Sequence, residues 1–415
     1  MYFGSVAQAT YDVWTATVGG TVEVGDLFNV TIGTKTLSVA ATTTVTATTA
    51  SDIATAFNAV DQSIYLEFAE YTAAVVGSTI VFTALAVGIP GIISVATTEA
   101  NGSTADTQTF GISHTTTATG PNDASNPINW STGLVPQATE NAYIKDTSVS
   151  LLYGLDFIAG TIGAGCTLRV HHTFGGNIGL PSTNPAGYPE YRNQVFKWSL
   201  AALYIGEGTA GTGASLIRIS SGSTLSGDCI VYQTSGNALD GVAPVHIHAT
   251  TLTKAQVFGG TVGIGQYLET ATVNAIVVKS GTLLLGRNIT TANTQTLDSA
   301  ASITYAAAQT GTLNIVGGSR ATTYGAIGTI NVYSGSLDLR GSGGTKILVG
   351  NNGNASLTNA SAAVSLSGGL EFLANAVFTD PRSTLSTSTA IKWTGCDMTT
   401  TSVNLGPART LTTTV

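Results

Sequence analysis

Charged side chains are scarce in this sequence of 415 residues, because Asp, Glu, Lys and Arg together make up only 9% of it. Ordinary soluble domains carry about 25%. Basic residues are rarer than acidic residues, with 15 Lys and Arg against 23 Asp and Glu, and they form no basic run. A nucleic-acid partner is therefore not expected, since such a partner requires a basic face. The hydrophobic share of 43% also argues against disorder, which goes with low hydrophobicity and high net charge.

Cysteine is equally rare, and the three that occur, Cys166, Cys229 and Cys396, lie far apart. An odd number at wide spacing predicts neither a disulfide framework nor a zinc knuckle, so we expect small buried hydrophobes. No metal or other cofactor is expected. A signal peptide is not expected either, because the segment after Met1 lacks a basic start and an apolar stretch.

Long hydrophobic runs are represented by one segment, residues 77–96, which carries no charge. Gly88, Pro90 and Gly91 interrupt it, and its apolar residues alternate at the period of a strand. The segment therefore predicts two strands with a turn at 88–91 rather than a membrane helix, and no membrane partner is expected.

Helix signals are limited to one good candidate, residues 52–60, with Ser51 as its N-cap. Strand-like segments surround it, so residues 1–118 are predicted to form a small N-terminal α+β sandwich module. A turn at Gly25-Asp26, a strand ending in Ile32-Gly33-Thr34 and then this helix form an order that resembles a small module of tailed-bacteriophage structural proteins.

The second half of the chain contains a repeated phrase, in which a short apolar strand, a glycine turn and another short strand follow one another. The recurring glycines are 21 to 34 residues apart, at Gly260, Gly281, Gly311, Gly335 and Gly369. A loose period of that length, with almost no helix signal, is typical of a solenoid of β-coils. The expected fold class is therefore mainly β, with the module followed by a right-handed parallel β-helix or β-solenoid over residues 146–415.

Residues 119–145 are predicted to be a linker and the cap of this β-helix. The phrase Asn129-Trp130-Ser131-Thr132-Gly133, followed by Ala142-Tyr143-Ile144, resembles one that tends to precede β-helical regions. Trp130 is suited to fill the open end of the first coil, where unpaired strand edges invite aggregation; a core tryptophan in a loop is the alternative. Over residues 129–228 the order of motifs resembles virion proteins encoded by tailed phages and prophages.

Signals for chemistry are weak. Gly206-Glu207-Gly208-Thr209-Ala210-Gly211 matches the dinucleotide pattern GxGxxG, but residues 215–219 after it alternate as a strand, where that site requires a helix. A glycine-rich turn is the preferred interpretation. Glycoside hydrolysis requires two carboxylates around a sugar groove, and the acids of the second half are sparse and unpaired. No catalytic residue is predicted, and an enzyme is not expected.

Two histidines, His246 and His248, lie two apart on a predicted strand and so face the same side. A metal site would need further ligands, for example His171 from a neighbouring coil. We therefore interpret the pair as a ladder or a subunit seam, which would be sensitive to pH because imidazoles gain charge near neutrality.

Tyrosine and arginine gather in the most polar cluster, where Glu190 and Arg192 are flanked by Tyr188 and Tyr191. Tyr and Arg are enriched at the energetic centres of interfaces. The cluster predicts an ion pair between subunits, and a loop that packs on its own coil is the alternative. Together with Trp130 and the two histidines, these residues are the interface candidates.

These observations predict a structural protein of a tailed-phage virion, at the capsid surface or the tail. We expect a homotrimer, because wrapping three stacks of coils together buries their flat strand surfaces. The favoured role is a decoration or cement protein bound to the major capsid protein or another virion protein. The alternatives are a tail spike or fibre that binds or cleaves host glycan, and a bacterial surface adhesin.

Overall fold

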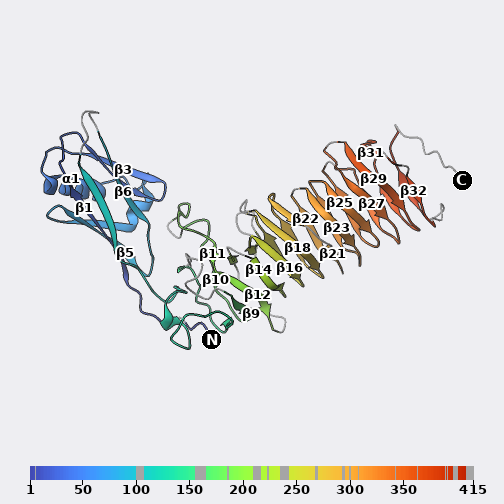
Figure 1. Ribbon diagram of the computed structural model, residues 1–415, viewed down its shortest axis with the longest axis horizontal. Coiled ribbons are helices and arrows are strands. Elements are labelled where there is room, and N and C mark those ends of the chain that lie inside the picture. Colours follow the sequence, from blue (N-terminus) through green and yellow to red (C-terminus); the bar gives the residue numbers. More distant parts are fainter. Residues whose placement is uncertain are drawn as a thin grey trace.

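The computed structural model describes residues 1–4, 6–99, 107–154, 165–184, 187–208, 216–221, 224–233, 243–266, 270–291, 295–298, 301–306, 308–341, 343–361, 363–387, 389, 391–395 and 401–407. Cys396 and the last glycine of the GxGxxG pattern lie outside these ranges. The fold is mainly β, as predicted. Figure 1 shows two parts: an N-terminal unit, formed by β1 to β7 with helix α1, and a long strand stack, formed by β8 to β33.

The N-terminal unit consists of two antiparallel sheets and a helix around one core. The sheet orders are β4-β5-β1-β7 and β3-β2-β6. Alternation decides which side chains are inside, since Phe28, Val30 and Ile32 of β2 are fully buried while Asn29 and Thr31 between them are not. The strands are β1 (Tyr11–Gly19), β2 (Leu27–Ile32), β3 (Lys35–Ala40), β4 (Tyr71–Val76), β5 (Thr79–Val87), β6 (Ile93–Thr98) and β7 (Thr109–Thr116).

Helix α1 covers Thr46–Asn58, so it begins earlier than the predicted range of 52–60 and ends two residues sooner. The predicted N-cap, Ser51, is wrong, because it lies inside the helix and the N-cap is Val45, which makes no side-chain capping bond. Packing explains the difference: Thr49 and Ala50 are fully buried. Burial of these two residues thus outweighs the poor helix propensity of the threonines in this part of the helix. A 3₁₀-helix, η1 (Leu66–Glu70), leads into β4.

The uncharged segment 77–96 forms strands and a turn, as predicted. It contains all of β5 and the beginning of β6, with the turn region between them. In the described part of the chain, no helix has the length and apolar character needed to cross a membrane.

The strand stack contains two parallel sheets, and most successive strands alternate between them, an arrangement compatible with the predicted β-helix. The larger sheet holds β8 (Asn141–Ile144), β9 (Cys166–His171), β12 (Leu200–Glu207), β14 (Thr224–Val231), β16 (Thr251–Val257), β18 (Ala271–Val278), β20 (Ile289–Thr291), β21 (Gln295–Leu297), β23 (Gln309–Ile315), β25 (Ile327–Val332), β27 (Gly343–Val349), β29 (Val364–Phe372), β31 (Leu385–Thr387) and β32 (Lys392–Trp393). The other holds β10 (Asn177–Ile178), β11 (Phe196–Lys197), β13 (Leu216–Ser220), β15 (Val245–His248), β17 (Thr261–Ile264), β19 (Thr282–Leu285), β22 (Ser302–Tyr305), β24 (Arg320–Thr323), β26 (Ser336–Leu339), β28 (Asn354–Ser356), β30 (Val377–Thr379) and β33 (Ser402–Asn404).

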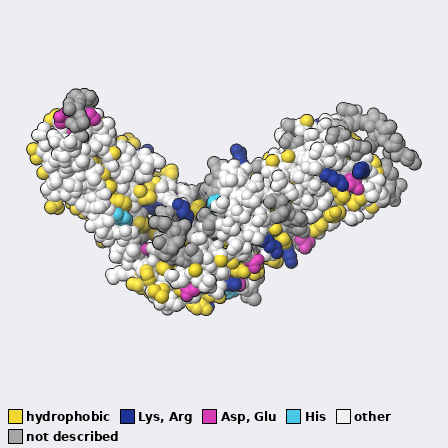
Figure 2. Space-filling view, viewed as in Figure 1, with side chains coloured by type: hydrophobic (Ala, Val, Ile, Leu, Met, Phe, Trp, Pro, Cys, Tyr) yellow, Lys and Arg dark blue, Asp and Glu magenta, His cyan; other side chains and the backbone are white. Residues whose placement is uncertain are grey.

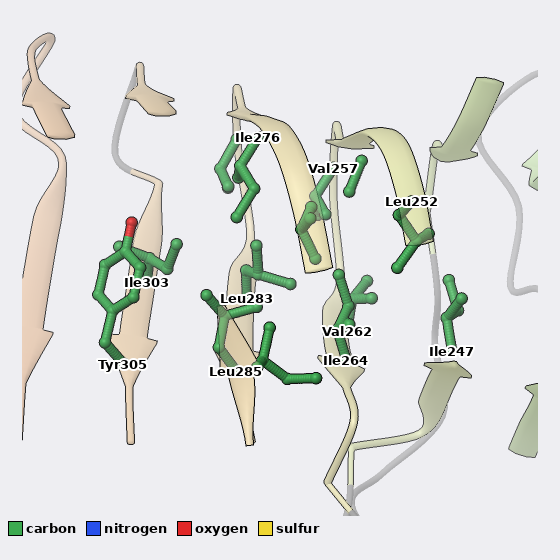
Figure 3. Close-up of a cluster of buried hydrophobic side chains, with 14 of the residues drawn as sticks. Ile247, Leu252, Val257, Val262, Ile264, Ile276, Leu283, Leu285, Ile303 and Tyr305 are labelled. Atoms are coloured by element: carbon green, nitrogen blue, oxygen red, sulfur yellow. The ribbon is translucent and has the colours of Figure 1, made fainter. Parts of the chain in front are cut away.

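One continuous hydrophobic core runs between these two sheets. Figure 3 shows Val257 and Ile276 from the larger sheet beside Val262 and Leu283 from the other. Each step along the stack places an equivalent residue beside the last, as Val257 pairs with Val278 and Val262 with Leu283. Cys166 and Cys229 belong to this core, which confirms the prediction that they are buried hydrophobes.

The repeated glycine phrases correspond to two kinds of feature. Those at Gly260, Gly281 and Gly335 are turns between a strand of one sheet and a strand of the other. Gly281 has a φ of 84°, and a Cβ there would clash with the Gly260 carbonyl of the preceding coil, so a side chain does not fit. The phrases at Gly311 and Gly369 differ from the prediction, because they lie inside β23 and β29, where the pairing shifts register.

Candidate functional site

The contact between the two parts of the chain is built on a loop that we call the joint loop, described over residues 180–184 and 187–194. Its ends close on each other, since the Leu180 N–H donates to the Gln194 carbonyl over 2.9 Å. Arg218, a fully buried residue of β13, holds both ends: its Nη1 donates to the Leu180 carbonyl at 2.7 Å and to Gln194 Oε1 at 3.1 Å. The loop is therefore fixed to the strand stack at its base.

The tip of the joint loop is fixed to the N-terminal unit through a buried ion-pair network. The Arg192 guanidinium bonds to Glu70 of η1 and, at 3.0 Å, to Glu190 of its own loop. Its Nε also donates to the Pro90 carbonyl at 2.6 Å. The Arg192 side chain is 6% exposed, so this cation is largely removed from water and depends on its partners.

Glu70 is the centre of this network. It accepts hydrogen bonds from the hydroxyls of Tyr188 and Tyr191, the latter at 2.9 Å, in addition to the one from Arg192. The Tyr191 ring packs against the hairpin turn at Gly33, where a Cβ would lie 2.8 Å from the tyrosine Cβ. Gly33 therefore allows the close approach of the two parts, as well as the turn between β2 and β3.

Electrostatics keep these groups in the protonation states that the contacts require. Burial would lower the pKa of Arg192, but its interactions with Tyr191, Glu70 and Glu190 outweigh that effect and raise it. Burial raises the pKa of Tyr188 and of Tyr191, and the nearby Glu70 adds to the rise. Both hydroxyls therefore remain donors at any physiological pH.

A second buried carboxylate, Asp12, supports the N-terminal side of the joint. It is fully buried and accepts bonds from the Tyr71 hydroxyl at 2.8 Å, His114 Nε2 at 2.7 Å and the Gly91 N–H at 3.1 Å. Burial alone would raise the pKa of Asp12, but hydrogen bonds from the Ala118 N–H and from these groups lower it. Because Gly91 follows Pro90, the network also fixes the carbonyl that Arg192 binds.

A cavity of about 470 Å³ opens beside the joint, between the N-terminal unit and the strand stack. Its wall is mainly apolar, with alanine, leucine, isoleucine and proline side chains from both parts. The polar groups that line it include the carboxylates of Glu70 and Glu190 and the hydroxyl-bearing ring of Tyr153. Burial raises the pKa of Tyr153 to about 12, so this phenol is neutral.

The structure brings four of the predicted interface residues together, namely Tyr188, Glu190, Tyr191 and Arg192. Tyr188, Tyr191 and Arg192 bond to Glu70 of the N-terminal unit of the same chain, and Glu190 joins them through Arg192. Tyr188 and Glu190 are almost fully buried. Neither prediction for this cluster, a contact between subunits or packing on its own coil, included this partner.

Trp130 lies at the start of the strand stack, away from the joint loop. It is 2% exposed, its Nε1 donates to the Ala124 carbonyl at 2.9 Å, and its ring meets Phe3 and Trp198 edge to face. All three rings belong to the stack core. The role of Trp130 in filling the open end of the first coil stays a prediction.

His246 and His248 lie on β15, on the side away from the core residues Val245 and Ile247. His246 is fully buried beside Arg218 in the neighbouring strand, and His248 Nδ1 bonds to Ser220 Oγ at 2.9 Å. His171 lies in the other sheet. Among the described residues, no group of three or more His, Cys, Asp or Glu is placed to hold a metal ion.

Sequence reasoning missed Glu70, Pro90 and Asp12. Glu70 is 122 residues from Arg192, and no local pattern marks the two as partners. The one available signal was Asp12 itself, the single aspartate of the β1 sequence, since a carboxylate at a buried strand position requires donors.

Comparison with known proteins finds no family model that matches the chain and no curated protein with significant sequence similarity. The segment after the GxGxxG pattern contains strand β13, whereas a dinucleotide site needs a helix there. The function must therefore be argued from the architecture, the joint and the surface.

Proposed function

We propose that this protein is a structural component of a tailed-bacteriophage virion, and specifically a decoration or cement protein that binds the major capsid protein as a homotrimer. In this proposal the strand stack is a right-handed β-helix, the usual hand of parallel crossover connections, and the N-terminal unit is an α+β sandwich. The observation that carries the proposal is the joint. A buried ion-pair network that fixes a compact unit to a long stack suits a structural protein, which holds its parts in set positions, rather than an enzyme.

The surface supports a role in assembly. On the outer faces of the N-terminal sheets, hydroxyl groups pair across strands, as Thr15 with Thr115 at 2.6 Å and Thr31 with Thr36 at 2.9 Å. Figure 2 shows a molecular face with few charged side chains. Short hydroxyl side chains lose little entropy when another protein covers them, so such a surface is readily buried.

Exposed apolar side chains favour the N-terminal unit as the end that attaches. Val75 and Val76 are exposed on β4, which is an edge strand, and Leu85, Val87 and Ile92 are exposed nearby in sequence. An edge strand with exposed valines offers both backbone hydrogen bonds and apolar contact to a partner. The strand stack would then project from the particle.

A glycan-cleaving spike receives less support from the strand stack. Sugars pack against the open faces of aromatic rings, but in three rings of the stack a neighbour covers one face: the Arg169 guanidinium lies 4.1 Å from the centre of the Tyr204 ring, and the rings of Tyr232 and Phe258 stack with their centres 5.7 Å apart. A groove of about 510 Å³ crosses the coils near Gln309, and the residues described in its lining include neither a carboxylate nor an aromatic ring. Hydrolysis of a glycosidic bond would require paired acids there.

The test is cryo-electron microscopy of particles made by the phage or prophage that encodes the chain, combined with mass spectrometry of those particles. Trimers over the capsid with the N-terminal unit at the capsid surface are expected. Density that projects from the tail, or particles without the chain, would refute the proposal. In a rebinding assay on stripped particles, Val76→Asp should lower occupancy at least tenfold, while the matched change Leu134→Asp at the cap should not.

A further inference from the structure

The cavity beside the joint has the properties of a ligand site rather than of a packing defect. Its volume of about 470 Å³ lies in the range of small-molecule sites, roughly 300–1,000 Å³. Both parts of the chain contribute to it, with Leu85 and Ile89 on one side and Leu152 and Leu180 on the other. A site of this kind takes the aliphatic portion of a ligand against these side chains.

The charges of the cavity wall indicate which polar group the ligand carries beside its aliphatic portion. Among the described residues that line it are two carboxylates, Glu70 and Glu190, and no cation. Arg192 neutralises one of the two charges but does not line the cavity. The cavity therefore faces a net negative wall, in an apolar setting where a charge interaction is stronger than in water.

Glu190 offers the specific contact. Its side chain is 2% exposed, and its Oε1 is occupied by the Arg192 guanidinium and backbone N–H, both at 3.0 Å. Within the described residues, its Oε2 accepts one long bond, of 3.3 Å, from Asn184 Nδ2. A carboxylate oxygen accepts more than one hydrogen bond, so Oε2 has capacity left for a donor in the cavity.

From these observations we propose that the cavity is a binding site for a free aliphatic amine, a molecule with one primary ammonium group on an alkyl chain. The ammonium donates to Glu190 Oε2, and the alkyl chain lies against the apolar wall from both parts. A bound amine joins the N-terminal unit to the strand stack and so stiffens the joint. The site is independent of the virion proposal, since its ligand is a small molecule.

Isothermal titration calorimetry of the full chain with n-hexylamine at pH 7 tests the site, with n-hexanol as the neutral probe of equal length. We expect hexylamine to bind at least tenfold more tightly than hexanol, because a hydrogen bond to a charged group is worth about tenfold or more. Glu190→Gln should remove that preference. No binding of hexylamine, or equal binding of the two probes, would overturn the proposal.

Two further variants locate the binding. Ala86 lines the cavity and is exposed, so Ala86→Phe places a ring in it without disturbing a buried contact. This variant should weaken hexylamine binding at least tenfold, whereas the matched Ala74→Phe, on an exposed position of β4 outside the cavity, should leave it unchanged. Unchanged binding in Ala86→Phe would overturn the location. Equal affinity for Nα-acetyl-lysine amide would overturn the free-amine assignment in favour of a lysine side chain.

Discussion

Replacing Arg192 with methionine should loosen the joint while leaving both hydrophobic cores intact. The substitution keeps the aliphatic stem but removes the cation that bonds to Glu70, Glu190 and the Pro90 carbonyl. Loss of one partner from a buried ion pair costs about 3–5 kcal/mol, because the carboxylates left behind lack a counter-charge. That cost falls on the contact between the two parts, since Arg192 lies between the cores and in neither of them.

Small-angle X-ray scattering and hydrogen exchange would measure this effect. For Arg192→Met we expect a broader distribution of intramolecular distances, and faster exchange in η1 and around Pro90, with exchange in the strand stack unchanged. Glu70→Gln in the same chain should restore part of the docking, because it removes one uncompensated charge. Arg340→Met is the matched control, since that arginine pairs with Asp338 at the surface and is 37% exposed, where such pairs contribute at most about 1 kcal/mol. Scattering and exchange identical to those of the unmodified chain would refute the role of Arg192.

The remaining predictions concern acid stability, thiol reactivity and the stack core. The folded-state pKa of Asp12 is lowered from 3.8, so the ionised carboxylate contributes stability above pH 4 (roughly) that is lost as the pH falls through the folded value. In urea titrations at a series of acidic pH values, Asp12→Asn should therefore reduce the dependence of the free energy of unfolding on pH. Burial raises the pKa of Cys166 and of Cys229 to about 12, so peptide mass spectrometry after iodoacetamide at pH 8 should find both unlabelled in the native chain and labelled in urea, and native labelling would contradict their burial. Leu283→Ala should lower the free energy of unfolding by about 2–5 kcal/mol in chemical denaturation. Leu284→Ala should lower it much less, because Leu284 is half-buried and faces outward. Equal losses for the two variants would mean that the alternation along β19 is wrong.

The sequence predicted those features that repeat or alternate locally. The turn at Gly281 has a positive φ, which favours glycine, and such a glycine is part of the repeated strand-and-turn phrase. Alternation of apolar residues at every second position identified β5 and β6 within an uncharged segment. Prediction failed where a distant contact decided the outcome. Helix α1 begins at Thr46, before the predicted start, and its residue Thr49 is fully buried, which no capping rule reveals.

The joint illustrates the same limit for the candidate site. Tyr188, Tyr191 and Arg192 were recognisable as a contact surface from their chemistry alone. Their partner was not, because Glu70 is one of two glutamates in η1 and becomes distinctive only when η1 and the joint loop meet. Residue type predicted that a contact exists, and only the fold identified what it contacts.

The path of the chain near its beginning has a consequence for how such proteins diversify. Phe3 pairs with Trp130 in the stack core, and a few residues later the Thr10 N–H donates to the Thr119 carbonyl at 2.9 Å, where the chain returns. The whole N-terminal unit is therefore an insertion between two neighbouring points at one end of the stack. A different domain with adjacent termini fits the same two points, so recombination can exchange the N-terminal unit while the strand stack and Trp130 are retained.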